Sequence, residues 1–199
     1  MRHRRFTLAA LAVFLLAGSP VWAFDARTTF ARGTLVGSIE GGGGEDSSVE
    51  HHRTSTQIEF WNAGVRLSLL PFGAAGAGLL FGALEVGLEP FYQRYGAGLD
   101  AFYAGLAAVG RYHFLSVGRF VPYVEVAGAA GGTDLNVREI DSDFAFLLFG
   151  GAGASVFVTD TTALYAGYRL QHVSNGGYQS PNRGFESHTG VIGLSTYFK

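Results

Sequence analysis

A regular alternation of residues over positions 163–174 is the feature that most constrains the fold of this chain. Successive side chains of an extended strand point to opposite faces of a sheet. Here one face would be largely apolar and the other richer in small and polar residues: Leu164, Ala166, Tyr168 and Leu170 against Tyr165, Gly167, Arg169 and Gln171. A strand with an apolar face for lipid and a more polar face for an interior is typical of a transmembrane β-barrel.

Seven further segments have the character of β-strands, which gives eight in all. The predicted strands are residues 28–40, 56–70, 79–93, 98–114, 120–131, 144–158, 163–174 and 186–198. An even number of antiparallel strands suits an outer-membrane barrel with both chain ends on the periplasmic side. The predicted fold class is therefore all-β, an eight-stranded antiparallel transmembrane β-barrel.

The connections between these strands alternate in character. Polar, Gly-rich connections over residues 41–55, 131–143 and 175–185 follow odd-numbered strands. Shorter ones follow even-numbered strands, at residues 71–78, 115–119 and 159–161. Barrels of this class combine long extracellular loops with short periplasmic turns. We therefore expect the first group to face the cell exterior.

The first 23 residues have the pattern of a secretion signal. Basic residues in the first five positions precede an apolar run over residues 6–18, and small residues precede a predicted cleavage after Ala23. This pattern is typical of a signal peptide, whose apolar core is too short to span a bilayer. We predict a signal peptide at residues 1–23 and one barrel domain at residues 24–199, located in the bacterial outer membrane.

Charge and cysteine content exclude several other classes of function. Removal of the signal peptide takes away three arginines and leaves 11 basic residues against 16 acidic ones, a net charge of about −5. An acidic chain without basic clusters is not expected to bind nucleic acid. The chain has no cysteine, which excludes thiol catalysis and cysteine-ligated metal sites.

Three chemically active residues flank the predicted connection 175–185. His172 and Ser174 continue the lipid-facing set of their strand, and Glu186 shares the parity of the apolar Ile192. Direct pairing of His172 with Glu186 would place both on one face of adjacent antiparallel strands. Glu186 could then orient His172, and His172 could take the proton of Ser174, which is the arrangement used in acyl transfer.

Acyl transfer also needs hydrogen-bond donors for the oxyanion. Candidates in the connection are the side chains of Asn182 and Asn175 and the backbone amide of Gly177. These residue types also have an ordinary interpretation, because Asn, Gly and Ser-Pro sequences are common in turns. However, lipid-facing ionisable residues are costly, by about 2–4 kcal/mol for a basic residue at the membrane midplane and by less near the interface. This cost favours a functional role.

The remaining ionisable residues receive structural interpretations. His51 and His52, near Glu45, Asp46 and Glu50, are interpreted as solvated loop residues rather than a metal site. His113, beside two aromatic residues, is predicted to lie in an interfacial aromatic belt. His188 shares the parity of Glu186 and could compete with His172 for it. Six charged residues are predicted to form ion pairs in the lumen: Arg66, Glu85, Glu89, Arg111, Glu125 and Arg169.

The segment 171–186, QHVSNGGYQSPNRGFE, resembles the outer-membrane lipid A 3-O-deacylases of the PagL family. The resemblance implies an eight-stranded barrel that hydrolyses the ester at the 3 position of lipid A and releases a 3-hydroxy fatty acid. It implies no metal or other cofactor. The expected partners are lipid A as substrate and the outer membrane. Whether the chain forms a homodimer stays open.

The same resemblance implies a role for each residue of the hairpin. Ser174 matches the family's nucleophile, His172 its base and Glu186 the carboxylate that orients the base. Asn182 and Asn175 match positions associated with the site, and Asn182 is the preferred donor for the oxyanion hole. The expected catalytic group is therefore a lipid-facing Ser-His-Glu triad.

Two other functions stay open from the sequence. A non-catalytic eight-stranded barrel could serve adhesion or envelope structure through its outer loops, and the long connection 41–55 is the best evidence for it. A related serine esterase could act on phospholipid, since the acyl-binding surface would be apolar in either case. The outward His, Ser and Glu argue for an enzyme, and they leave the choice of lipid open.

Overall fold

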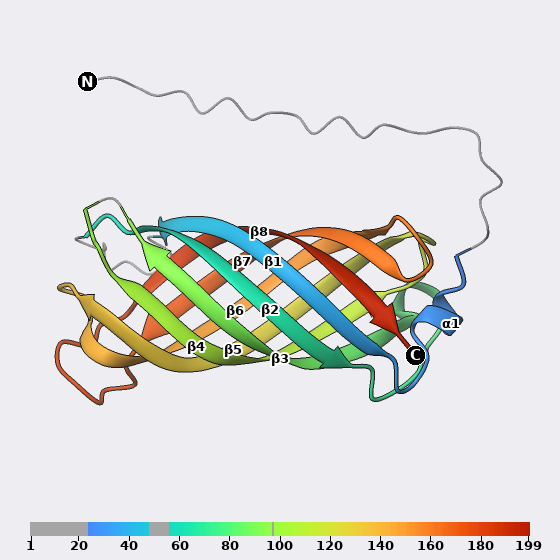
Figure 1. Cartoon of the computed structure of the whole chain (residues 1–199), viewed down its shortest axis with the longest axis horizontal. Coiled ribbons are helices and arrows are strands. Elements are labelled where there is room, and N and C mark those ends of the chain that lie inside the picture. Colours follow the sequence, from blue (N-terminus) through green and yellow to red (C-terminus); the bar gives the residue numbers. More distant parts are fainter. Residues whose placement is uncertain (1–23, 48–55, 97) are drawn as a thin grey trace, which may run out of the picture.

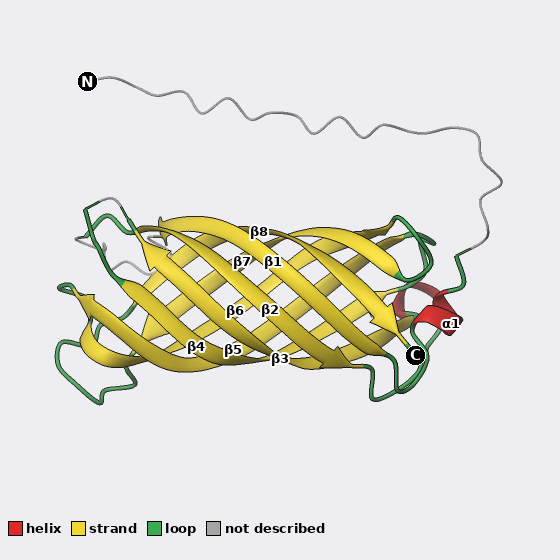
Figure 2. Cartoon of the chain, in the orientation of Figure 1, coloured by secondary structure: helices red, strands yellow, loops and turns green. Residues whose placement is uncertain are grey.

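The strands of this protein close on themselves into a single barrel. The computed structural model describes residues 24–47, 56–96 and 98–199, in which each strand runs antiparallel to both neighbours and the last pairs with the first (Figures 1 and 2). The strands are β1 Leu35–Ser47, β2 Glu59–Leu69, β3 Gly82–Tyr95, β4 Phe102–Phe114, β5 Phe120–Asn136, β6 Asp141–Phe157, β7 Thr162–Ser174 and β8 Phe185–Phe198. The predicted fold class is confirmed.

The two faces of the barrel wall have the polarity expected in a membrane. On β2 the outward Trp61 and Leu67 are exposed, while the inward Asn62 and Arg66 are buried. The parity predicted for β7 is also confirmed, because Tyr168 is exposed outward and Arg169 is buried. Apolar outside and polar inside is the reverse of a water-soluble protein and matches a barrel in lipid.

Ion pairs fill the middle of the lumen, as predicted. Arg111 Nη2 lies 2.8 Å from Glu125 Oε2, and Arg169 Nε lies 2.8 Å from Glu125 Oε1. Arg66 Nη1 lies 3.2 Å from Glu89 Oε2. All of these groups are buried. An eight-stranded barrel is just wide enough for side chains to fill its interior, so the network packs the lumen.

The prediction for His113 is wrong. Its side chain is fully buried inside the barrel, and its Nε2 lies 2.8 Å from Glu85 Oε2. The reason is parity, since His113 is two residues from Arg111 on β4 and therefore shares its inward face. The aromatic neighbours Tyr112 and Phe114 point the other way.

The start of the described chain is helical, whereas a strand was predicted from residue 28. Helix α1 is the single turn Ala26–Thr29, and Asp25 caps it by accepting a hydrogen bond of 3.0 Å from the Arg27 amide. Phe30 follows it and is fully buried between Tyr197 and Phe157. This segment closes the end of the barrel that holds the C-terminus, called here the terminal end (Figure 1). Among the described residues, no helix has the length and apolar character needed to cross a membrane.

At the opposite end, called here the loop end, three strands extend further than predicted. β1 continues through Ser47, so the predicted loop 41–55 begins as strand. β5 and β6 also extend toward each other, and only residues 137–140 join them. A glycine run had indicated a loop, but β1 needs glycine at Gly44 because a Cβ there would lie 2.2 Å from the carbonyl oxygen of His188.

Candidate functional site

The register of β7 and β8 brings His172 and Glu186 together. The two residues are direct partners across the strands, and His172 Nδ1 lies 2.9 Å from Glu186 Oε1. Because a carboxylate can only accept, the Nδ1–H of His172 donates this bond, which leaves Nε2 as the ring nitrogen able to accept a proton. The predicted pairing of these two residues is present.

Ser174 ends β7 on the same outward face. It lies two residues beyond His172, which places their Cα atoms about 6.6 Å apart at the rise of an extended strand. Its cross-strand partner on β6 is Phe146, an exposed aromatic residue. The serine is half-buried and opens toward the outer surface. The three candidate catalytic residues therefore share one patch of the outward wall at the loop end.

Gly184 is a site residue that the sequence reasoning missed. It has φ +67°, and a Cβ at this position would lie 3.2 Å from His172 Nε2 and 2.7 Å from the Val173 carbonyl oxygen. Only glycine adopts this backbone freely and leaves room for the imidazole. The Asn-Arg-Gly sequence before β8 was the available signal, because a glycine directly before a strand often marks a positive φ.

The three oxyanion candidates lie in the β7–β8 loop, residues 175–184. Asn175 is fully buried, and its amide N–H donates to Asn182 Oδ1 at 2.8 Å. Its side chain donates to the Gln179 carbonyl at 3.0 Å and accepts the Gly177 amide at 3.0 Å. Asn175 and Gly177 thus use these groups to hold the loop together. Asn182 uses its oxygen in the same way, so its Nδ2 is the end that could donate to an oxyanion. The role of each of these three residues in an oxyanion hole stays a prediction.

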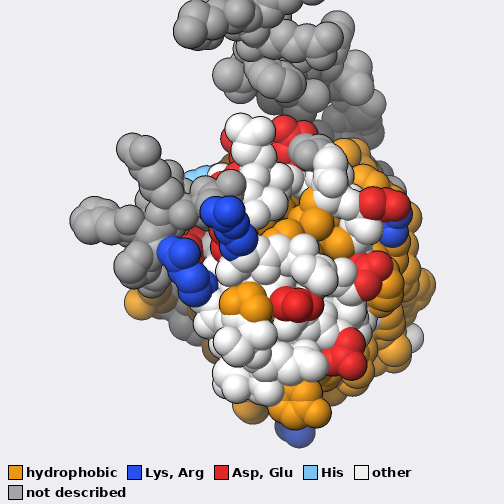
Figure 3. All heavy atoms as spheres, turned by 90° about the vertical axis from the view of Figure 1, so that its left-hand side faces the viewer, with side chains coloured by type: hydrophobic (Ala, Val, Ile, Leu, Met, Phe, Trp, Pro, Cys, Tyr) orange, Lys and Arg blue, Asp and Glu red, His pale blue; other side chains and the backbone are white. Residues whose placement is uncertain are grey.

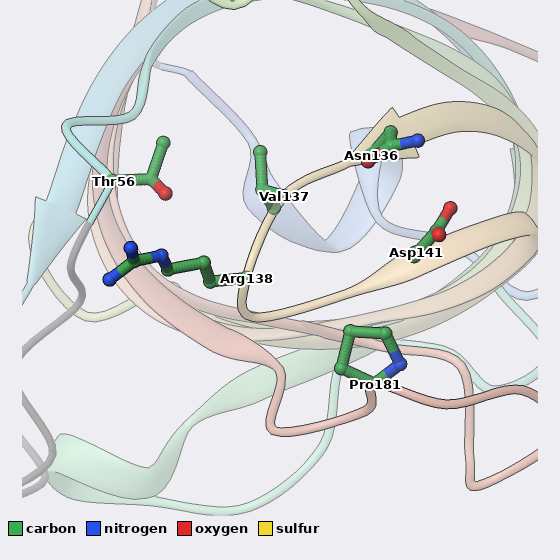
Figure 4. A pocket seen from close by; sticks show the side chains of 6 residues that line it. All are labelled: Thr56, Asn136, Val137, Arg138, Asp141 and Pro181. Atoms are coloured by element: carbon green, nitrogen blue, oxygen red, sulfur yellow. The ribbon is translucent and has the colours of Figure 1, made fainter.

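The β5–β6 turn supports the loop that carries these residues. Asn182 forms a bridge with Ile140, and the amides of Arg183 and Gly184 donate to the Glu139 carbonyl at 2.8 and 3.1 Å. Figure 4 shows Pro181 of the loop beside this turn, at a hollow of about 530 Å³. Sequence reasoning missed this contact because it joins segments about 40 residues apart and depends on the extension of β5 and β6.

The other candidates are placed elsewhere. His188 lies beside Tyr168, whose hydroxyl forms a hydrogen bond with His188 Nδ1, so Glu186 is left to His172. Glu45 is an exposed residue of β1, while Glu50, His51 and His52 fall outside the described residues. Within the part of the chain that is described, no three His, Asp or Glu side chains lie close enough to hold a metal ion.

The site lies near the polar loop end of the barrel. Figure 3 looks onto the loop end and shows charged side chains spread over it, with some hydrophobic ones among them and many along the visible wall. The His172–Glu186 pair and Ser174 lie where the apolar wall meets the polar end. The fold and the site together define an outer-membrane β-barrel that carries a His-Glu pair and a nearby serine on its outward wall.

Comparison with known families gives a more specific assignment. The family model described as "Lipid A 3-O-deacylase (PagL)" matches residues 50–195. The chain belongs to this family, as its resemblance over residues 171–186 predicted.

Solved structures agree on the fold. The crystal structure of the outer membrane enzyme PagL covers 78% of this chain and 97% of its own, with a TM-score of 0.60 and 18% sequence identity. Neisserial surface protein A covers 83% of this chain and 97% of its own, with a TM-score of 0.56 and 15% identity. At such identities the likeness supports the fold alone. No curated protein sequence matches the chain.

Proposed function

We propose that this protein hydrolyses the ester-linked 3-hydroxyacyl chain at the 3 position of lipid A. Ser174 is the nucleophile, His172 the base and Glu186 the carboxylate that orients it. The observation that carries the proposal is the 2.9 Å bond between His172 Nδ1 and Glu186 Oε1 on the outward wall, two residues from a half-buried serine, in a chain of the lipid A deacylase family.

The geometry supports a two-step acyl transfer. His172 Nε2 takes the proton of Ser174 Oγ as the oxygen attacks the ester carbonyl, and Glu186 stabilises the imidazolium that forms. The Nδ2 group of Asn182 is the proposed donor to the oxyanion. When the tetrahedral intermediate collapses, His172 returns the proton to the sugar oxygen, which leaves as the 3-hydroxyl.

The second step removes the acyl group from the enzyme. A water molecule attacks the acyl ester of Ser174 and gives its proton to His172 Nε2. Collapse of this intermediate releases the 3-hydroxy fatty acid and returns the proton to Ser174 Oγ. The outward position of the site supports this sequence, because a lipid in the outer leaflet can reach it sideways without leaving the membrane.

Mass spectrometry of lipid A incubated with purified, refolded protein tests the proposal. Parent protein should remove one 3-hydroxyacyl group from the 3 position, and Ser174→Ala should remove none. Ser180→Ala, at an exposed serine in the same loop, is the matched control and should retain activity.

The alternatives predict different results in the same assay. Release of fatty acid from phospholipid and not from lipid A would favour the phospholipid esterase. No release from either lipid by a protein whose folding is verified would favour a non-catalytic barrel. Full activity in Ser174→Ala would exclude the proposed nucleophile.

A further inference from the structure

A second polar surface lies beside the His172–Glu186 pair. It is a hollow of about 440 Å³ on the outward side of β7, β8, β1 and β2. Its lining includes Gly43, Glu45, Glu59, Tyr168, His188 and Gly190. His188 is two residues from Glu186 along β8, about 6.6 Å at the rise of a strand. The hollow therefore begins directly beside the proposed catalytic residues.

Glycines make the floor of this hollow. Cross-strand pairing places Gly190 opposite Gly43, with Tyr168 on the other side of Gly190 and Trp61 on the other side of Gly43. Tyr168 is exposed outward and lines the hollow, so an aromatic side chain stands at one end of a floor without side chains. A Cβ at Gly190 would meet no atom within 4 Å. Packing of the barrel therefore does not require glycine at this position.

The polar groups around the floor offer both donors and acceptors. His188 Nδ1 forms a hydrogen bond with the hydroxyl of Tyr168 in which either atom can be the donor. In the neutral tautomer whose Nδ1 accepts, the proton is on Nε2 and can be donated from there. Glu45 and Glu59 are direct partners on the adjacent strands and are both exposed, and carboxylates only accept. A ligand that fits must donate hydrogen bonds to two carboxylates and can accept one from an imidazole.

Charge narrows the ligand class further. The described residues that line the hollow include two glutamates and neither Lys nor Arg. A phosphate group would be repelled by these carboxylates, whereas sugar hydroxyls and amide N–H groups are neutral donors that suit them. The exposed ring of Tyr168 also suits the apolar face of a sugar ring. An uncharged sugar with hydroxyl and amide groups is therefore the best match.

We propose that this hollow binds an uncharged, hydroxyl- and amide-bearing sugar portion of the substrate headgroup while the neighbouring ester lies at Ser174. The inference rests on the proposed function and adds to it a basis for choosing a glycolipid over a glycerophospholipid. Glu45 and Glu59 accept from the sugar, His188 donates to it, and Gly43 and Gly190 leave it room.

The test fills the hollow without touching the catalytic residues. Gly190→Leu places a side chain on the floor, and Gly110→Leu is the matched control. Gly110 lies on the outward face of β4, where an added Cβ would make only an ordinary contact at 3.9 Å with Val126. Each variant is assayed for lipid A deacylation and for the rate at which a small fluorophosphonate labels Ser174, since this probe has no sugar.

The inference predicts a lower kcat/KM for lipid A and an unchanged rate of labelling of Ser174 by the probe. Losing one or more hydrogen bonds to charged acceptors should lower kcat/KM for lipid A by at least about tenfold in Gly190→Leu relative to Gly110→Leu, mainly through KM. The ratio of deacylation to labelling should fall by the same factor. Equal kcat/KM for lipid A in the two variants would overturn the inference.

A second variant separates sugar binding from simple obstruction. The double substitution Glu45→Gln and Glu59→Gln keeps the shape of the hollow and removes both charged acceptors, so KM for lipid A should rise several-fold or more. An unchanged KM would overturn the assignment to a sugar. If the parent protein neither cleaves lipid A nor is labelled at Ser174, the proposed function itself fails, and this outcome is distinct from failure of the hollow alone.

Discussion

Substitution of Gly184 by alanine would test how closely the loop positions His172. The added Cβ would lie 2.7 Å from the Val173 carbonyl oxygen, 3.0 Å from His172 Cε1 and 3.2 Å from His172 Nε2. The imidazole must then move by a few tenths of an ångström or turn away from residue 184. Alanine at φ +67° also costs about 1–2 kcal/mol in backbone strain.

The strain and the contact can be separated by a matched control. Gly118 has φ +65°, lies at the terminal end, and has no atom within 4 Å of an added Cβ. Gly118→Ala therefore carries the same backbone strain without the contact to His172. Since a misplacement of about 1 Å can cost about 100-fold in rate, we expect kcat of Gly184→Ala to fall about 10- to 100-fold below that of Gly118→Ala.

The assay is initial-rate release of fatty acid from lipid A, with the free energy of unfolding in detergent measured for both variants. Gly184→Ala should also be the less stable variant, because its Cβ lies 2.7 Å from the Val173 carbonyl oxygen, and a loss of kcat in the folded Gly184→Ala protein would agree with the reasoning. Equal kcat values in the two variants would refute it, because they would show that the contact between Gly184 and His172 does not govern the position of the base.

Three further predictions concern the site and the scaffold. Glu186→Ala should lose about 10- to 100-fold less activity than His172→Ala, because Glu186 orients and stabilises the base rather than reacting; equal losses measured as kcat/KM would contradict that role. Arg169→Met should lower the free energy of unfolding by about 3–5 kcal/mol, because it removes the nearest charged partner of the buried Glu40 and leaves the buried Glu125 with Arg111 as its hydrogen-bonded arginine; denaturant titration in detergent would contradict the lumen account if the change is under about 1 kcal/mol. Deacylation should persist after thorough treatment with a chelator, and restoration of lost activity by a divalent metal would contradict the metal-free mechanism.

The barrel could be predicted from the sequence because its signal is local. Alternation along 163–174 follows from the two faces of a strand, and the same parity correctly placed Arg169 in the lumen and His172 and Glu186 on the outward wall. The pairing of His172 with Glu186 followed from the same count, since paired residues of adjacent strands share a face.

Other features depend on contacts that local sequence does not encode. Phe30, directly after α1, packs against β4, β6 and β8 through His113, Phe157 and Tyr197, and these contacts cannot be read from residues 24–34. His113 was assigned from its aromatic neighbours when the parity of β4 should have decided its side of the wall. Gly184 and the turn at 137–140 shape the site through contacts between distant segments, so only the folded chain reveals their effect on His172.

Labelling with a serine-reactive fluorophosphonate, followed by identification of the labelled peptide, is the most direct test of the central claim. If the outward Ser174, activated by His172 and Glu186, is the nucleophile, the label will be found on the peptide that contains Ser174, and His172→Ala will abolish it. Label on a different residue, or lipid A turnover that continues after Ser174 is fully labelled, would contradict the account.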